Sequence, residues 1–415
     1  MAVSPATSRD LRRSNRAVIL GELLFRGTSS RQALAAKTRL SAATVGVVIS
    51  ELLDEGLVHE VGSEESNGGR PRTILRVAAE RAISVGVDLG ERGLRVEAFD
   101  LAWRRRSEVL VDLNAGTVAP DALVDHIASA VRAVVAQAGL PDAWLLGVGV
   151  SVPGVVERTD SAEVYASGFG WSGLPLGALL APAIPGLVVV DNGAKAMGQA
   201  ELWFGAAKGA TDAVVALLGI GVGAAIITDG KLYRGTRSSA GEWGHTPIVV
   251  DGDACRCGSR GCLEAYVGES AILRRWEAAA PTAAIGAGRT DTDRLEALFR
   301  GSPDDPDAAA VTADFARNLG AGLATLINLF NPERIVLAGS VGLRVTPAVL
   351  AEVRAAAERY ALRQPFESVE IVQGSLGDDA VALGAATLVV DRLLARGFSL
   401  ARESADPTSL AGALP

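Results

Sequence analysis

The chain has 415 residues, of which 49% are hydrophobic and 21% charged, which is enough apolar material for two or three buried cores. All three cysteines lie within eight positions, which excludes a disulfide framework and favours a reducing environment. The net charge is −8, yet residues 9–40 carry eight basic and two acidic side chains, a local charge of +6. We therefore expect a small DNA-facing module joined to an acidic body.

No secretory signal or membrane span is expected. Residues 1–20 carry four arginines and lack an apolar core. The apolar run 213–228 is interrupted by Gly219, Gly221 and Gly223 and is too short to cross a bilayer. The protein is accordingly expected in the cytoplasm, with no membrane partner.

Residues 1–80 predict a DNA-binding domain of the winged helix-turn-helix type. Apolar residues at helical spacing run up to Gly27, a short helix follows a serine cap, and a third helix begins after Ser41 and ends at Gly56. The next segment predicts two short strands around a glycine-rich tip, which is the pattern of a wing. In this arrangement the third helix enters the major groove by its N-terminal end.

The residues predicted to touch DNA form three groups. At the start of the third helix, small or polar side chains would contact base edges and thymine methyl groups: Ser41, Ala42, Ala43 and Thr44. In the second helix, basic side chains would bind phosphates: Arg31 and Lys37. At the wing tip, in the sequence GGRPR, Arg70 and Arg72 would suit a narrow minor groove. The alternative is a protein-interaction module whose arginines are solvated.

Beyond residue 80, the chain repeats a unit in which a buried strand runs into a glycine-containing turn. These units predict an α/β body whose loops converge on a cleft, and they occur at 82–104, 145–157, 185–207, 216–232 and 334–342. Singly, each turn is a weak signal of phosphate binding, because none matches GxGxxG or a Walker loop. Tight turns without a ligand are the alternative for each unit.

The cysteine cluster is a more specific signal. His245 precedes Cys255, Cys257 and Cys262, and the cysteines are spaced Cys-x-Cys-x4-Cys. Three thiolates and one imidazole match a closed tetrahedral Zn2+ site. Since no ligand position is left open, the zinc is expected to be structural. The alternative is three inert buried thiols beside an unrelated histidine.

Several stretches together resemble the ROK family (repressors, open reading frames and sugar kinases) over residues 11–396. The matches are AGEWGH (240–245), CRCGSRGCLE (255–264), GVGVSVPGVV (147–156) and VVVDNGAKA (188–196). The N-terminal winged helix with NGGRP (67–71) is similar to the repressor branch, including its xylose- and N-acetylglucosamine-responsive members. The resemblance implies a two-lobed, actin-like α/β fold of the sugar kinase and Hsp70 type.

This fold implies a division of the chain after the winged helix. Residues 81–205 would form the first lobe, together with a return helix at 380–396, and residues 206–379 the second lobe with the zinc loop. Residues 397–415 lack sustained periodicity and are expected to form a mobile tail.

The resemblance also implies a sugar site. By motif position, Glu242, His245 and Glu264 would touch sugar hydroxyls, with Asn192 beside them, and His245 would use its other nitrogen for zinc. Lys195 stands where the family kinases carry Asn, and we hypothesise that it pairs with an anionic sugar derivative. The alternatives are a bridge from Lys195 to Glu201, or a pocket that binds nothing.

Three departures from the kinase pattern argue against phosphoryl transfer and predict a protein that is not an enzyme. Gly193 replaces the Asp that acts as general base in the family kinases, and glycine cannot accept a proton. Glu91 lies in the first phosphate turn, where its carboxylate would repel a phosphate, and Ile220 removes the hydroxyl of the second turn.

The sequence thus predicts a sugar-responsive repressor of carbohydrate genes. It would bind a double-stranded DNA operator as a homodimer or a dimer of dimers, and a sugar or sugar derivative would act as effector. Two other functions remain open: an ATP-dependent sugar kinase with an added DNA-binding module, and a DNA-binding protein that does not respond to a ligand.

Overall fold

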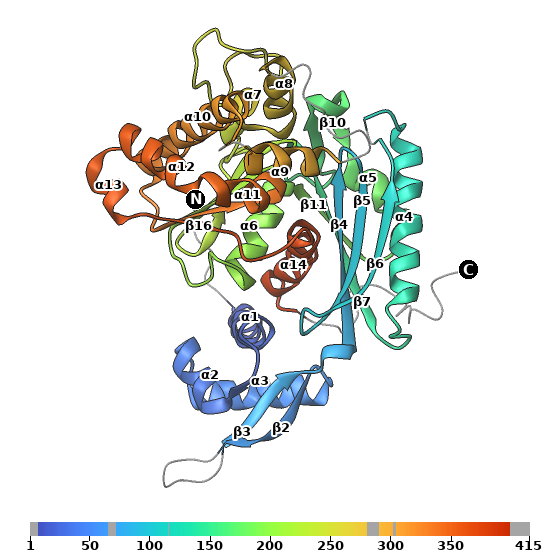
Figure 1. Cartoon of the computed structure of the whole chain (residues 1–415). Coiled ribbons are helices and arrows are strands. Elements are labelled where there is room, and N and C mark those ends of the chain that lie inside the picture. Colours follow the sequence, from blue (N-terminus) through green and yellow to red (C-terminus); the bar gives the residue numbers. More distant parts are fainter. Residues whose placement is uncertain (1–6, 65–71, 115, 280–289, 302–303, 399–415) are drawn as a thin grey trace.

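A computed structural model of the chain describes residues 7–64, 72–114, 116–279, 290–301 and 304–398. The N-terminal helices and wing lie below two larger lobes, each built on its own five-stranded sheet (Figure 1). Within the described residues, no helix combines the length and the apolar character that a membrane span requires.

The N-terminal domain consists of three helices and a small sheet. Its elements are α1 (Ser8–Arg26), β1 (Ser29–Ser30), α2 (Arg31–Thr38), α3 (Ala42–Asp54), β2 (Val58–Glu64) and β3 (Arg72–Val77). Side-chain oxygens of Thr7, Ser30 and Ser41 accept backbone hydrogen bonds at the starts of α1, α2 and α3, which fixes where each helix begins. The strands pair in the order β1-β3-β2, so the predicted winged helix-turn-helix is confirmed.

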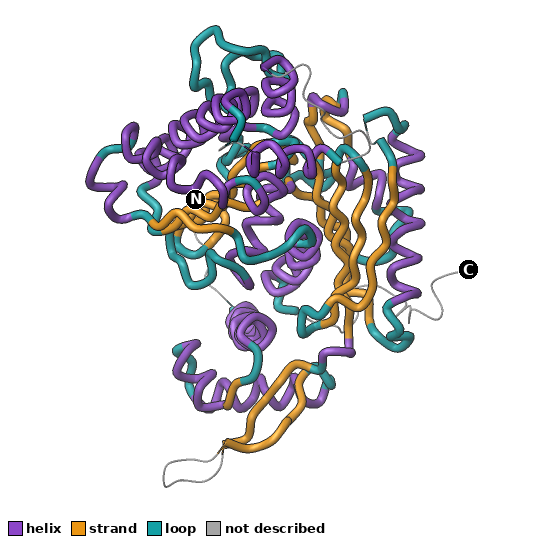
Figure 2. The backbone as a smooth tube through the Cα atoms, in the orientation of Figure 1, coloured by secondary structure: helices purple, strands orange, loops and turns teal. Residues whose placement is uncertain are grey.

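The first lobe is built on a sheet with strand order β11-β7-β4-β5-β6. Its strands are β4 (Ala82–Gly90), β5 (Gly93–Asp100), β6 (Arg105–Asp112), β7 (Trp144–Val152) and β11 (Leu187–Asn192). A side sheet and two helices complete it: β8 (Val155–Val156), β9 (Glu163–Ala166), β10 (Trp171–Pro175), α4 (Pro120–Gln137) and α5 (Leu176–Leu180). The sheet lies between α4 on one face and α14 (Ala380–Ala395) on the other (Figure 2).

The second lobe is built on a sheet with strand order β14-β13-β12-β15-β16. Its strands are β12 (Ala213–Leu218), β13 (Val222–Thr228), β14 (Lys231–Tyr233), β15 (Arg334–Ala338) and β16 (Glu370–Gln373). Its helices are α7 (Glu264–Val267), α8 (Glu269–Ala279), α9 (Asp291–Gly301), α10 (Pro306–Phe330), α11 (Gly339–Arg344), α12 (Thr346–Tyr360) and α13 (Arg363–Ser368). The α6 helix (Gly193–Phe204) connects the first lobe to the second.

The α14 helix returns from the second lobe and packs closely against α6 and the first sheet. A Cβ atom on Gly86 would lie 1.8 Å from the carbonyl oxygen of Ala382, and one on Gly149 would lie 1.9 Å from that of Ala385. Both distances are far below van der Waals contact, so only glycine allows this helix to approach the sheet so closely.

The end of α14 also packs against the N-terminal domain. Val389, Val390 and Phe398 belong to the same buried cluster as Ile19 and Leu23 of α1. Arg16 Nε donates a hydrogen bond of 2.8 Å to the carbonyl oxygen of Phe398, which is 2% exposed. The expectation that a mobile tail begins at residue 397 is therefore wrong for Gly397 and Phe398, and residues 399–415 lie outside the described residues.

Candidate functional site

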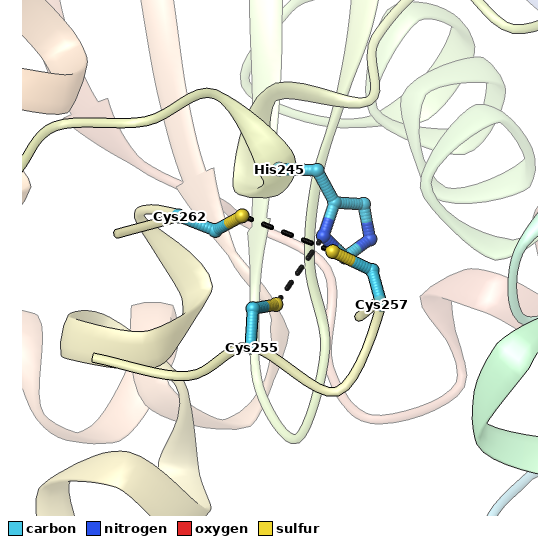
Figure 3. Close-up of side chains that lie close together, drawn as sticks. All are labelled: His245, Cys255, Cys257 and Cys262. Carbon is cyan, nitrogen blue, oxygen red and sulfur yellow. Dashed lines mark hydrogen bonds between the residues drawn. The ribbon is translucent and has the colours of Figure 1, made fainter. Parts of the chain in front are cut away.

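The three cysteines and His245 converge on one point of the second lobe (Figure 3). Their four ligand atoms all lie within 4.8 Å of one another. The Cys257 and Cys262 sulfurs are 3.8 Å apart, and the Cys255 sulfur is 3.7 Å from His245 Nδ1. Two thiolates bound to one tetrahedral zinc at about 2.3 Å would be roughly 3.8 Å apart. The residues therefore fit a four-coordinate metal ion.

The chemistry of the thiols also fits a bound cation. Burial raises the pKa of the Cys255 thiol to about 12 and also raises the pKa of Cys262. Thiolates at these positions therefore require a positive charge beside them. The loop turns back at Gly261, whose φ is 74° and whose Cβ atom would lie 1.7 Å from the carbonyl oxygen of Val249.

The glycines of the AGEWGH stretch place its polar residues at the interlobe cavity. A Cβ atom on Gly241 would lie 1.9 Å from the Ala224 carbonyl oxygen, and one on Gly244 would lie 2.1 Å from that of Val222. The segment therefore lies directly against β13, with Trp243 buried beneath it. Glu242 and His245 then belong to the cavity wall.

The cavity between the lobes has a volume of about 340 Å3. Both lobes contribute to its wall, and four of the five predicted sugar-binding residues belong to it: Asn192, Glu242, His245 and Glu264. The three positions that depart from the kinase pattern also line it: Glu91, Gly193 and Ile220. The volume falls in the range of small-molecule sites.

Lys195 is the exception, and the structure corrects its predicted role. The side chain is 2% exposed and is absent from the cavity wall. Burial lowers the pKa of Lys195, while the carboxylates of Asp191 and Glu242 favour its charged form. The alternative, a bridge from Lys195 to Glu201, is not formed either: the Glu201 oxygens accept backbone hydrogen bonds from Ala206 at 2.6 Å and Leu376 at 3.3 Å. Lys195 therefore lies behind the cavity wall, where the carboxylates of Asp191 and Glu242 interact with its charge.

Glu242 and Asn192 have different environments in the wall. Burial raises the pKa of Glu242, whereas Lys195 and His245 oppose that shift. Asn192 caps α6 through Oδ1, which accepts a hydrogen bond of 3.2 Å from the Lys195 backbone, and its Nδ2 donates to the Gly154 carbonyl at 2.7 Å. Asn192 therefore also holds the turn that follows β7.

Glu264 is 7% exposed and is held from two sides. Its Oε2 accepts a hydrogen bond of 2.9 Å from the Val222 backbone, and its Oε1 accepts one of 2.8 Å from Arg256 Nε. Arg256 also pairs with Glu91 and lines the cavity. Arg256 was not among the predicted site residues, although its position between two of the predicted metal ligands, Cys255 and Cys257, indicates that it lies at the site.

The predicted DNA-contacting residues lie on the N-terminal domain. Ser41, Ala42 and Ala43 are exposed at the start of α3, and Ser41 Oγ accepts a hydrogen bond of 3.1 Å from the Thr44 backbone. Lys37 and Arg72 are also exposed. Arg31 instead pairs with Glu60 at 3.1 Å, which partly neutralises it. Arg70 lies outside the described residues.

The fold and the site together define a class: a winged helix-turn-helix joined to a two-lobed actin-like body of the sugar-kinase type. The family model described as the ROK family matches residues 84–392. The chain belongs to the ROK family, as predicted.

Three similar proteins cover most of the chain. The xylose repressor of Bacillus subtilis (strain 168) is 29% identical over 390 residues, covering 92% of this chain and 97% of its own. The crystal structure of a ROK family transcriptional regulator, a homologue of the E. coli MLC protein, has a TM-score of 0.78 at 23% identity and covers 94% of this chain and 98% of its own. A ROK family glucokinase from Streptomyces griseus, in complex with glucose and AMPPNP, has a TM-score of 0.64 at 30% identity and covers 75% of this chain and 100% of its own.

Proposed function

We propose that this protein is a sugar-responsive DNA-binding transcriptional regulator that represses carbohydrate genes. The winged helix-turn-helix would bind an operator through α3, and the cavity between the lobes would bind the effector. The similarity to a xylose repressor over 92% of the chain supports this assignment.

One observation carries the proposal: the α6 helix runs from the cavity to the DNA-binding domain. The first residues of α6, Gly193 and Ala194, line the cavity. At the other end of α6, the Trp203 ring lies 3.8 Å from the Phe25 ring of α1, centroid to centroid. A displacement of α6 by a ligand would therefore reach α1 directly, as allosteric coupling requires.

The charge of the cavity favours a neutral sugar over the anionic ligand considered from the sequence. The charged groups in the described part of its wall, other than His245, are Asp88, Glu91, Glu242, Arg256, Glu264 and Asp378. Arg256 is already paired with Glu91 and Glu264. The surplus of carboxylates would repel an anion, whereas carboxylates accept hydrogen bonds from sugar hydroxyls.

The metal is proposed to be Zn2+ in a structural role. His245, Cys255, Cys257 and Cys262 would hold it, and three sulfurs with one imidazole are ligands that zinc prefers. When bound, zinc supplies a rigid cross-link of the loop and stabilises the thiolates. The chain itself orients His245 and Glu264 toward the effector.

We propose that the protein is not a kinase. Gly193 offers no base at the start of α6, and the turn that carries Glu91 is occupied by the Arg256 ion pair. The chain also resembles a glucokinase at 30% identity, so a kinase with an added DNA-binding module is the second candidate. ATP-dependent phosphorylation of a sugar panel would support that candidate and contradict ours.

Operator binding is proposed to require a homodimer or a dimer of dimers. Helix-turn-helix proteins read two half-sites about one helical turn apart, so two α3 helices are needed at once. Sugar-induced movement of the lobes would change the spacing of these two helices. A DNA ligand and reduced thiols both fit the cytoplasm, which is the location that we propose.

The test is a titration of the full-length protein on the DNA upstream of its own gene. Operator affinity would be measured alone and with neutral sugars, sugar phosphates and uronic acids. We expect a neutral monosaccharide to change the affinity about 5- to 150-fold, the usual range of allosteric coupling. Tight operator binding that no sugar alters would instead identify a protein that does not respond to a ligand.

A further inference from the structure

A chain of charged contacts crosses the cavity from one lobe to the other. Glu91, in the turn between β4 and β5 of the first lobe, pairs with Arg256 on the metal loop of the second. Arg256 Nε donates to Glu264 Oε1 at 2.8 Å, and Glu264 Oε2 accepts from the Val222 backbone at 2.9 Å. A single guanidinium therefore links a residue of the first lobe to a residue that lines the cavity from the second.

The same turn makes a second link through its next residue. Arg92 pairs with Glu269 at 2.6 Å and with Asp291 at 2.7 Å, both in the second lobe. These contacts join the lobes without touching Glu264. Both arginines therefore link the lobes, but of the two only Arg256 also contacts a predicted sugar-binding carboxylate.

The position of Arg256 in the chain explains how its side chain is aimed. Its neighbours Cys255 and Cys257 both belong to the proposed metal site, and the Cys255 backbone donates a hydrogen bond of 2.9 Å to the Ser259 carbonyl. The backbone of Arg256 is thereby fixed on both sides. The planar guanidinium can then meet two carboxylates at once, which a lysine ammonium on a flexible stem does less well.

We propose that Arg256 is a positioning residue: it holds Glu264 in the orientation that contacts the sugar and, through Glu91, makes that orientation depend on closure of the lobes. This inference rests on the proposed function. It assigns a role to the turn that follows β4, where Glu91 serves as the partner of Arg256. It also predicts that removing the charge of Glu91 in the first lobe changes the orientation of the Glu264 side chain in the second lobe.

The test compares three variants of the full-length, metal-loaded protein. Glu91→Gln keeps the shape of the side chain but removes its charge. Arg256→Lys keeps the positive charge but loses the planar guanidinium that meets two carboxylates. Arg92→Gln removes only the ion pairs of Arg92 with Glu269 and Asp291. Affinity for the neutral sugar that acts on the wild type would be measured by calorimetry at 50 mM and 500 mM salt. Metal content and operator affinity without sugar serve as controls for folding.

We expect Glu91→Gln and Arg256→Lys to weaken sugar binding about 3- to 10-fold, as loss of a partly buried ion pair would. The wild type should lose affinity at high salt, because Glu91 and Arg256 are each about one-third exposed, and Glu91→Gln should lose that salt dependence. Arg92→Gln should keep both the salt dependence and most of the affinity. Equal affinity and equal salt dependence in Glu91→Gln and the wild type would overturn the inference.

A readout without sugar separates this inference from the proposed function. Hydrogen–deuterium exchange of peptides that contain Val222 should be faster in Glu91→Gln than in the wild type or Arg92→Gln, because Glu264 would release the Val222 amide. Unchanged exchange at Val222 would contradict the positioning role. If the wild type bound no sugar while exchange at Val222 rose as expected, the proposed function would fail and the Glu91–Arg256–Glu264 link would stand.

Discussion

Phe25 and Trp203 are in ring contact between the DNA-binding domain and the helix that begins at the cavity. Their ring centroids lie 3.8 Å apart, at an interplanar angle of 39°. Trp103 completes the contact, since its Nε1 donates a hydrogen bond of 3.1 Å to the Leu24 carbonyl. These aromatic side chains join α1, the turn after β5 and the end of α6 in one cluster. A change in the angle of α6 would therefore be transmitted to α1 through these packed side chains.

Replacing Phe25 by Ala should separate sugar binding from DNA binding. We expect operator affinity without sugar and sugar affinity without DNA each to change less than about threefold, while the effect of sugar on operator affinity falls by about 1 kcal/mol or more. A thermodynamic cycle of DNA titrations with and without sugar would measure this. Phe299→Leu, in the Phe299–Phe315 pair of the second lobe, serves as the control and should retain the coupling. Full coupling in Phe25→Ala would contradict the α6 route.

Replacing Cys257 by Ser should remove the metal and with it the response to sugar. The variant loses one of four ligands, so the loop would no longer hold His245 and Glu264 in place. We expect metal content to fall from about one ion per chain, with operator binding retained and sugar response lost. Arg260→Ala, on the same loop, should keep both the metal and the response. Sugar-dependent DNA binding in a metal-free Cys257→Ser protein would show that the loop has another role.

Lys37 and Arg31 should contribute unequally to DNA binding. Lys37 is exposed and makes no ion pair with any other described residue, whereas Arg31 is paired with Glu60 at 3.1 Å. Lys37→Ala should weaken operator binding at low salt. It should also reduce the slope of log affinity against log salt concentration by about 1, the amount expected for one phosphate contact. Arg31→Ala should have the smaller effect, because its charge is partly neutralised in the free protein. A larger loss in Arg31→Ala would mean that the Glu60 pair opens on DNA.

Asp88 should make the protein less stable as pH rises through the weakly acidic range. Burial raises the pKa of Asp88 from 3.8 to about 6, so the folded state binds this proton more tightly than the unfolded state. The free energy of unfolding therefore decreases between about pH 4 and pH 6. Asp88→Asn should remove this slope and stabilise the protein at pH 7 by roughly 1–2 kcal/mol, less than the full shift because water reaches the cavity.

Denaturant unfolding at pH 4, 5, 6 and 7 would measure the effect of Asp88→Asn. Asp378→Asn is the matched control, since Asp378 also lines the cavity but pairs with Arg344 at 2.6 Å. Burial also raises the pKa of Glu97 to about 7, so part of the pH dependence should remain in both variants. Equal slopes in Asp88→Asn and the wild type would refute the assignment to Asp88.

The features that the sequence predicted correctly depend on neighbours in the chain. The serine caps of the N-terminal helices and the Cys-x-Cys-x4-Cys spacing are local, so caps and metal cluster were both expected. Lys195 was misjudged because residues two apart on a helix do not share a face: Gly193 lines the cavity and Lys195 does not. The Glu91–Arg256 pair joins residues 165 positions apart, and only the packed lobes bring them together.

The contact between Arg16 and the Phe398 carbonyl has a consequence for how the protein is made. The ribosome releases the winged helix first, yet α1 is completed by Val389, Val390 and Phe398, which are synthesised after both lobes. During translation the DNA-binding domain therefore exists without its final partner surface. The contacts of α1 with α14 and Phe398 form only when α14 has returned to the first sheet, so a chain interrupted before α14 would lack this part of the support for its DNA-binding domain.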